Sequence, residues 1–172
     1  RPARNRGGDI IRVTPTLDTS AYAQGDVLFT ATEVPGVVNG GGGVSRLLAM
    51  YMIDLSDNAD DMFFVLSEKG TTNLGSINGT AGISDSTLVA NNILGLMAID
   101  SDQADTSTYI DRLKIHQAFG MSTAGENLNN NMLLKSSAQS ESIYVQGVLT
   151  SATTPTFADA DIQLIFHVEF LS

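Results

Sequence analysis

The chain has 172 residues, a net charge of −10 and no cysteine. This length suits one domain with a substantial core, and the missing cysteines exclude disulfides and thiolate metal ligands. An acidic body is repelled by nucleic-acid phosphates, and no apolar stretch approaches the length of about 20 residues that crosses a bilayer. We therefore expect no membrane partner, and no nucleic-acid partner unless the basic N-terminal residues alone bind one.

The charge is unevenly distributed along the chain. The first twelve residues carry +3, which leaves −13 for the remaining 160. We interpret residues 1–12 as a basic, extended N-terminal arm and residues 13–172 as one domain. The arm is either a solvated, disordered terminus or a tether to an acidic partner. Its candidate partner-binding residues are Arg1, Arg4, Arg6 and Arg12.

Apolar and β-branched segments separated by turn residues predict a series of strands and one short helix. The expected strands are residues 9–13, 27–32, 44–54, 62–66, 93–99, 109–119, 132–135, 143–150 and 162–170. The expected helix covers residues 84–91, with Ser84 or Asp85 as its cap. The glycine run 40–43 and the polar turn 57–60 are each expected to connect consecutive strands as a hairpin.

Three of these strands have informative side-chain patterns. Residues 44–54 are apolar on both alternate faces, which predicts a strand covered on both sides, within a sandwich or at a subunit contact. In residues 109–119, Ile115 and Phe119 are expected on one face and His116 on the other. One of these faces is expected to contact solvent or a partner. Residues 162–170 alternate strictly, as a long half-buried strand does.

These elements predict an all-β fold. Strands at this spacing with almost no helix favour an antiparallel β-sandwich of jelly-roll type, and a partly open barrel is the nearest alternative.

The sequence offers little support for catalysis. His116 and His167 fall on different expected strands without the local ligand spacing of a zinc site. No Gly-x-Ser-x-Gly motif holds a nucleophile, and the glycine run precedes a strand with no lysine nearby, unlike a phosphate-binding loop. The acidic residues leave glycoside hydrolysis open by residue type alone. We expect a protein that is not an enzyme and has no cofactor.

Three acidic clusters fit either solvated turns or calcium ligation, and solvated turns are favoured because aspartate is a common turn residue. They lie at positions 54–61, 100–105 and 159–161. The strongest calcium candidate consists of Asp100, Asp102 and Asp105.

Residues 15–26 follow the pattern P-x-L-D-x-S-x-Y-x-x-G-D, and a glycine-rich turn and a strand ending in Asp54 come after it. This first third of the chain resembles the opening of a group of small structural proteins of tailed bacteriophage virions. The resemblance implies a β-sandwich decoration or cement protein on the outer capsid surface, bound to the major capsid protein. The arm, the acidic body and the resemblance together lead us to expect a symmetric homo-oligomer, with a trimer favoured, because a sandwich without disulfides gains stability from assembly. Related proteins serve as knobs, fibres or tail parts, so the alternative is a host-recognition or carbohydrate-binding module. Tyr22 is expected to pack inward.

Overall fold

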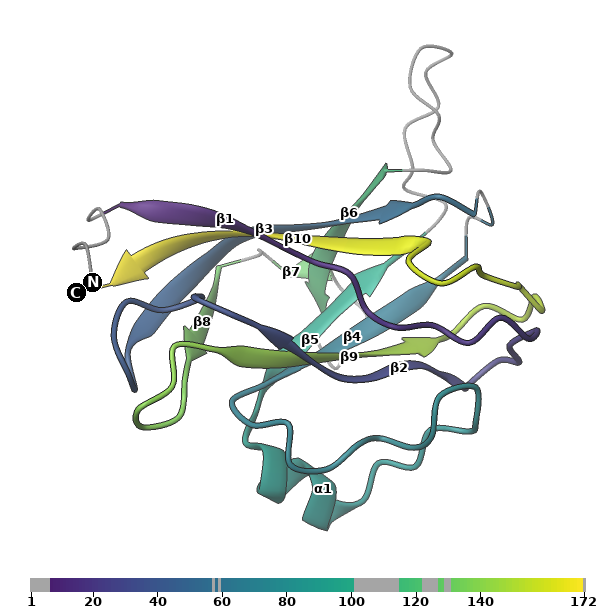
Figure 1. Cartoon of the computed structure of the whole chain (residues 1–172), viewed down its shortest axis with the longest axis horizontal. Coiled ribbons are helices and arrows are strands. Elements are labelled where there is room, and N and C mark those ends of the chain that lie inside the picture. Colours follow the sequence, from purple (N-terminus) through teal and green to yellow (C-terminus); the bar gives the residue numbers. More distant parts are fainter. Residues whose placement is uncertain are drawn as a thin grey trace.

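The structure is a computed structural model that describes residues 7–56, 58, 60–100, 115–121, 127–128 and 131–171. Within these ranges the chain is all-β apart from one short helix. The strands form one curled, mostly antiparallel sheet with the shape of a half-barrel (Figure 1). The prediction of an all-β fold is therefore confirmed.

The described elements, in chain order, are β1 (Gly8–Val13), β2 (Val27–Val34), β3 (Val44–Asp54), β4 (Met62–Ser67), α1 (Asp85–Asn91), β5 (Ile93–Ile99), β6 (Ile115–Met121), β7 (Asn127–Leu128), β8 (Met132–Lys135), β9 (Ile143–Leu149) and β10 (Ile162–Leu171). Ser84 caps α1 by accepting a hydrogen bond from the Thr87 backbone N–H at 3.2 Å, as the sequence predicted. Strand β1 includes residues 8–12 of the predicted arm.

The strand order is β1-β10-β3-β6-β5-β4-β9-β2, with β7 beside β6 and β8 beside β3. Strand β6 pairs with β3 on one side and β5 on the other, so the sheet folds over at β6. Figure 1 shows the two halves as an upper and a lower layer. We call β1, β10, β3, β6 and β8 the β10 layer, and β5, β4, β9 and β2 the β9 layer.

The main core fills the space between the two layers. Alternate residues of β10, including Leu164 and Phe166, point inward and are fully buried. From the β9 layer, Phe29 and Phe64 stack with ring centroids 6.1 Å apart. Inward residues from both layers thus share one apolar interior, and the predicted half-buried character of the last strand is confirmed.

A second, smaller cluster lies on the outer side of the β9 layer, where residues 69–84 cover the strands (Figure 1). Outward residues Val65 and Val148 pack with Leu74 of the covering loop. Gln146 of β9 accepts a hydrogen bond from the Leu74 backbone N–H at 2.9 Å and donates to the Thr72 carbonyl at 3.3 Å. The chain itself therefore covers the part of this outer face around Gln146 and Val148.

Both predicted hairpins are wrong. Strand β2 pairs with β9 and β4 pairs with β5 and β9, whereas β3 pairs with β10, β6 and β8. The connections before and after β3 therefore cross between layers. Apolar alternation fixes which residues face the core, but it does not identify the neighbouring strand, and turn residues serve tight hairpins and layer crossings alike.

Strand β6 has the opposite orientation to that predicted. Ile115 is half exposed and His116 is buried, because His116 lies opposite the inward Met52 in the β3 register. Residues 109–114 of the expected strand lie outside the described ranges. The alternation of polar and apolar residues therefore does not predict which face of β6 points to the core, because this strand places His116 inward at the end of the core.

Candidate functional site

Among the described residues, no loop or helix covers the outer face of the β10 layer, which we call the bare face. Four large apolar side chains on it are about half exposed: Ile10 at 55%, Leu48 at 48%, Ile115 at 50% and Leu133 at 59%. The prediction that the third strand is covered on both sides is wrong for the isolated chain, because Leu48 points outward and is exposed. The alternative, a subunit contact, stays a prediction.

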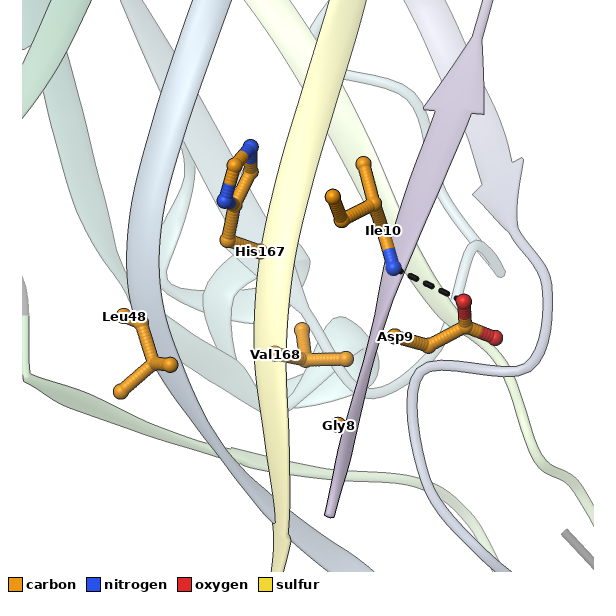
Figure 2. Close-up of a pocket in the computed structure, with 6 residues that line it drawn as sticks. All are labelled: Gly8, Asp9, Ile10, Leu48, His167 and Val168. Carbon is orange, nitrogen blue, oxygen red and sulfur yellow. Dashed lines mark hydrogen bonds between the residues drawn. The ribbon is translucent and has the colours of Figure 1, made fainter. Parts of the chain in front are cut away.

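A bulge in β3 brings Leu48 to this face. His167 lies opposite Ala49 and Val168 lies opposite Leu47, so Leu48 is an extra residue between consecutive pairs. Such an insertion bends a strand and redirects its side chains. Figure 2 shows Leu48, His167 and Ile10 standing beside one another on neighbouring strands β3, β10 and β1.

Between these side chains lies a shallow hollow of about 420 Å³, which we call the β1–β10 hollow (Figure 2). It is lined by Gly8, Asp9, Ile10, Leu48, His167 and Val168. Glycine is required at position 8, because a Cβ there would lie 2.3 Å from the Val168 carbonyl oxygen. The Asp9 carboxylate accepts a hydrogen bond from the Ile10 backbone N–H at 2.8 Å, so it stays at the hollow's edge.

Positive charge gathers on the same face. The described ranges contain only four of the chain's nine Lys and Arg residues, namely Arg12, Arg46, Lys69 and Lys135. Arg12, Arg46 and Lys135 are exposed at positions that alternate with the inward residues of β1, β3 and β8. Arg46 forms an ion pair with Glu169 at 3.2 Å. The bare face thus combines exposed apolar side chains with excess positive charge.

A buried polar group lies at the end of β3. Asp54 is fully buried, and its Oδ1 accepts hydrogen bonds from the Ser56 backbone N–H at 2.8 Å and from the Ser56 hydroxyl. Burial raises the pKa of Asp54, while the Ser56 hydrogen bonds and the charge of His116 oppose this rise and Asp60 adds to it. No hydrogen-bond partner for Asp54 Oδ2 occurs within the described ranges.

This acidic group does not form a metal centre. Across the residues whose positions are described, no three His, Asp or Glu side chains are arranged to hold a metal ion. Asp100 directly follows β5, but Asp102 and Asp105 lie outside the described ranges, so the calcium candidate stays a prediction. His116 points into the core and His167 outward, so the two histidines do not share a site.

The predicted arginine site is only partly described. Arg12 is exposed on the outer side of β1, and its neighbour Ile11 is buried in the core. Arg1, Arg4 and Arg6 lie outside the described ranges.

The motif at residues 15–26 has a structural explanation. Tyr22 is buried, and its hydroxyl accepts from the Asp18 backbone N–H at 2.7 Å and donates to the Leu28 carbonyl at 3.0 Å. Its ring meets Phe157 edge to face at 5.7 Å. Asp26 accepts from the Ala23 backbone N–H at 2.7 Å. The inward packing predicted for Tyr22 is confirmed, and these motif residues build a loop.

Comparisons with protein-family models, with curated proteins and with solved structures find no match for the chain. In the described part of the chain, no helix has both the length and the apolar character needed to cross a membrane. The two layers and the bare face are therefore the observations that bear on function. The sequence did not predict this face, although the apolar residues on both sides of the strand at 44–54 indicated it.

Proposed function

We propose that the two layers form a jelly-roll sandwich. Four antiparallel pairs are nested along the chain: β1 with β10, β2 with β9, β3 with β6, and β4 with β5. Successive pairs alternate between the β10 layer and the β9 layer, and the β10–β3 and β9–β4 ladders join the pairs within each layer. A long hairpin rolled into two sheets has this order, which is common in viral capsid and lectin domains.

The function that fits this architecture best is a non-enzymatic structural protein of a phage virion. In this proposal the chain decorates the capsid, binds the outer surface of the major capsid protein lattice and stabilises it. The motif at residues 15–26 supplies the resemblance to virion proteins. The acidic charge of −10 agrees with a place on the outer surface, away from packaged nucleic acid.

The observation that carries the proposal is the contrast between the two outer faces. Residues 69–84 cover the part of the β9 layer around Val65 and Val148, whereas Ile10, Leu48, Ile115 and Leu133 are exposed on the β10 layer. Large apolar side chains gathered on one exposed face favour an interaction site. A broad β face suits attachment to a lattice of protein subunits.

We further propose that the chain assembles as a symmetric homo-oligomer, with a trimer favoured, when it occupies symmetric positions on the capsid. Sedimentation of the purified protein tests this, because a trimer would have three times the monomer mass of 18.2 kDa. A protein that stays monomeric both in solution and on the particle would contradict it.

The experiment that tests the main proposal uses particles assembled without this chain. Purified protein is added, and binding is followed by co-sedimentation and by the location of new density on the particle. We expect saturable binding on the outer surface and a higher temperature of particle disruption. Absence of binding, or density on the tail or fibres alone, would contradict capsid decoration.

The basic arm has its own test. Deletion of residues 1–6 removes three of the four arginines of the predicted arm and leaves β1 intact. If the arm is a tether, the truncated protein binds the particles more weakly and the loss shrinks at high salt, which screens charge pairs. Unchanged binding would mean that the arm is a solvated terminus.

A host-recognition or carbohydrate-binding module is the second candidate, favoured by a polar cleft of about 570 Å³ between two loops. Within it, Ser142 donates a hydrogen bond to Glu33 at 2.6 Å. Its lining residues are Glu33, Pro35, Gly36, Gly41, Gln139, Ser140, Glu141 and Ser142, without an aromatic platform. Saturable binding on a glycan array, lost in Glu33→Ala, would favour this candidate over capsid decoration.

A further inference from the structure

We infer that the bare face of the β10 layer binds an acidic protein surface, which inserts an apolar side chain into the β1–β10 hollow. This inference rests on the proposed function and specifies the chemistry of the capsid surface that the chain contacts. It places the contact with the capsid on this face and predicts that the contacted surface is negatively charged.

The hollow supplies the apolar part of the contact. Its volume is about 420 Å³, and Ile10 and Leu48 border it with roughly half of each side chain exposed. Interfaces concentrate their binding energy in a few residues that fill central, desolvated pockets. A hollow bordered by exposed aliphatic side chains is suited to receive an apolar anchor from a partner.

The distribution of charge specifies the rest of the partner surface. The chain carries −10 overall, yet Arg12, Arg46 and Lys135 all lie on this face. Glu169 is already paired with Arg46, and neither Arg12 nor Lys135 forms a salt bridge with any residue in the described ranges. The carboxylate of Asp9 at the edge of the hollow offsets one of these charges, so the three cations still exceed the two acidic side chains by one. Because interfaces match opposite potentials, this face favours acidic residues around the apolar anchor.

A second copy docked face to face is a poor fit to the same charges. A two-fold contact places a patch against a copy of itself, so two faces that each carry more positive than negative charge would repel one another. The phosphate backbone of a nucleic acid would gain little from contact with the apolar hollow, and the acidic body would repel it. An acidic partner protein satisfies both the apolar and the charged parts of the face.

The apolar test compares Leu48→Glu with Val89→Glu, using particles assembled without the chain as the probe. Val89 is 75% exposed on α1, outside the bare face, so it is a control for adding an acid to an exposed apolar site. We expect Leu48→Glu to weaken binding by at least about tenfold and Val89→Glu to leave it unchanged. Both variants are checked for wild-type circular dichroism and thermal midpoint.

The charge test compares Lys135→Glu with Lys69→Glu. Both lysines are exposed, but Lys69 follows β4, outside the bare face. Lys135→Glu should weaken binding several-fold at about 0.05 M NaCl, and the loss should shrink at about 0.5 M because salt screens the attraction. Lys69→Glu should bind as the wild type does.

A photoreactive residue at position 48 identifies the contacted segment, with the same residue at position 89 as the control. We expect position 48 to cross-link to a capsid-protein peptide with more acidic than basic residues. A cross-link to a basic peptide, to nucleic acid or to another copy of this chain would overturn the inference. So would wild-type binding by both Leu48→Glu and Lys135→Glu, and capsid decoration would then stand without it. If the wild-type protein binds no particles, both proposals fail.

Discussion

The outer faces of the two layers differ in how far the chain covers them. On the β9 layer, Gln146 points outward into hydrogen bonds with the covering loop, and Val148 packs beneath Leu74. On the β10 layer, His167 and Glu169 point outward and remain partly exposed. The β9 layer is thus covered on its outer side around Gln146 and Val148, while the described outer residues of the β10 layer have no such cover.

This difference separates the parts of the chain that maintain the fold from those available for binding. A residue beneath the loop loses contacts within its own chain when it is shortened, whereas a residue on the bare face loses few. Matched substitutions on the two faces should therefore differ in their effect on stability. If the effects on stability are equal, the outer face of the β10 layer is covered in solution.

The largest expected effect comes from Leu74→Ala, compared with Leu48→Ala. Leu74 is 1% exposed in the cluster beneath the loop, and Leu48 is 48% exposed on the bare face. Leu74→Ala should lower the free energy of unfolding by about 2–5 kcal/mol, and Leu48→Ala should change it by less than about 0.5 kcal/mol. Urea denaturation of both variants measures this, and equal losses would contradict the comparison.

Glutamines on the central strand of each layer give the next largest contrast. Gln146 is fully buried and holds the backbone of Thr72 and Leu74, whereas Gln163 of β10 is only partly buried and lies outward. Gln146→Ala should destabilise the protein by about 1–3 kcal/mol because it leaves buried backbone groups without partners. Gln163→Ala should have an effect of less than about 0.5 kcal/mol. Hydrogen exchange at the Leu74 amide should also accelerate in Gln146→Ala alone.

The sequence predicted the strands better than their pairing. The bounds expected for β3, β5 and β8 agree with the structure, because each is an apolar run between clear turn residues. Pairing depends on contacts between distant segments, and local patterns do not encode these. The bulge that exposes Leu48 exists only in the register of β3 against β10, so the sequence could not locate the hollow.

The buried carboxyl at the end of β3 predicts a pH dependence of stability. Burial raises the pKa of Asp54 from 3.8, so the folded protein holds its proton to higher pH than the unfolded chain does. The folded state therefore binds more protons within this window, and the free energy of unfolding falls as pH rises through it. Above the raised pKa, the full penalty for the buried charge is present.

Asp54→Asn removes this titration while its Oδ1 can still accept the Ser56 hydrogen bonds. Between about pH 4 and about pH 7, the stability of the variant should therefore fall less than that of the wild type. Asp18→Asn is the control of opposite sign, because hydrogen bonds from Ser20 and then from Asn78 lower the pKa of Asp18. Loss of the Asp18 charge should remove stability that is present above pH 3.8 and fades on acidification. Identical pH profiles for the wild type and Asp54→Asn would contradict the assignment.

The smallest expected effect concerns the inner side of the β10 layer. Ser45 of β3 is fully buried, and its hydroxyl has no hydrogen-bond partner within the described ranges. Ser136 is equally buried, but its hydroxyl donates to the Ser140 carbonyl at 2.6 Å. Ser45→Ala should raise the free energy of unfolding by up to about 1 kcal/mol, whereas Ser136→Ala should lower it by about 1 kcal/mol. Because its outer side is bare, the β10 layer is held mainly by its contacts with the core. Removal of the unpaired Ser45 hydroxyl should therefore give a change in the free energy of unfolding that urea denaturation can measure. If Ser45→Ala were as destabilising as Ser136→Ala, the Ser45 hydroxyl would have a partner in solution and this account of the inner face would be wrong.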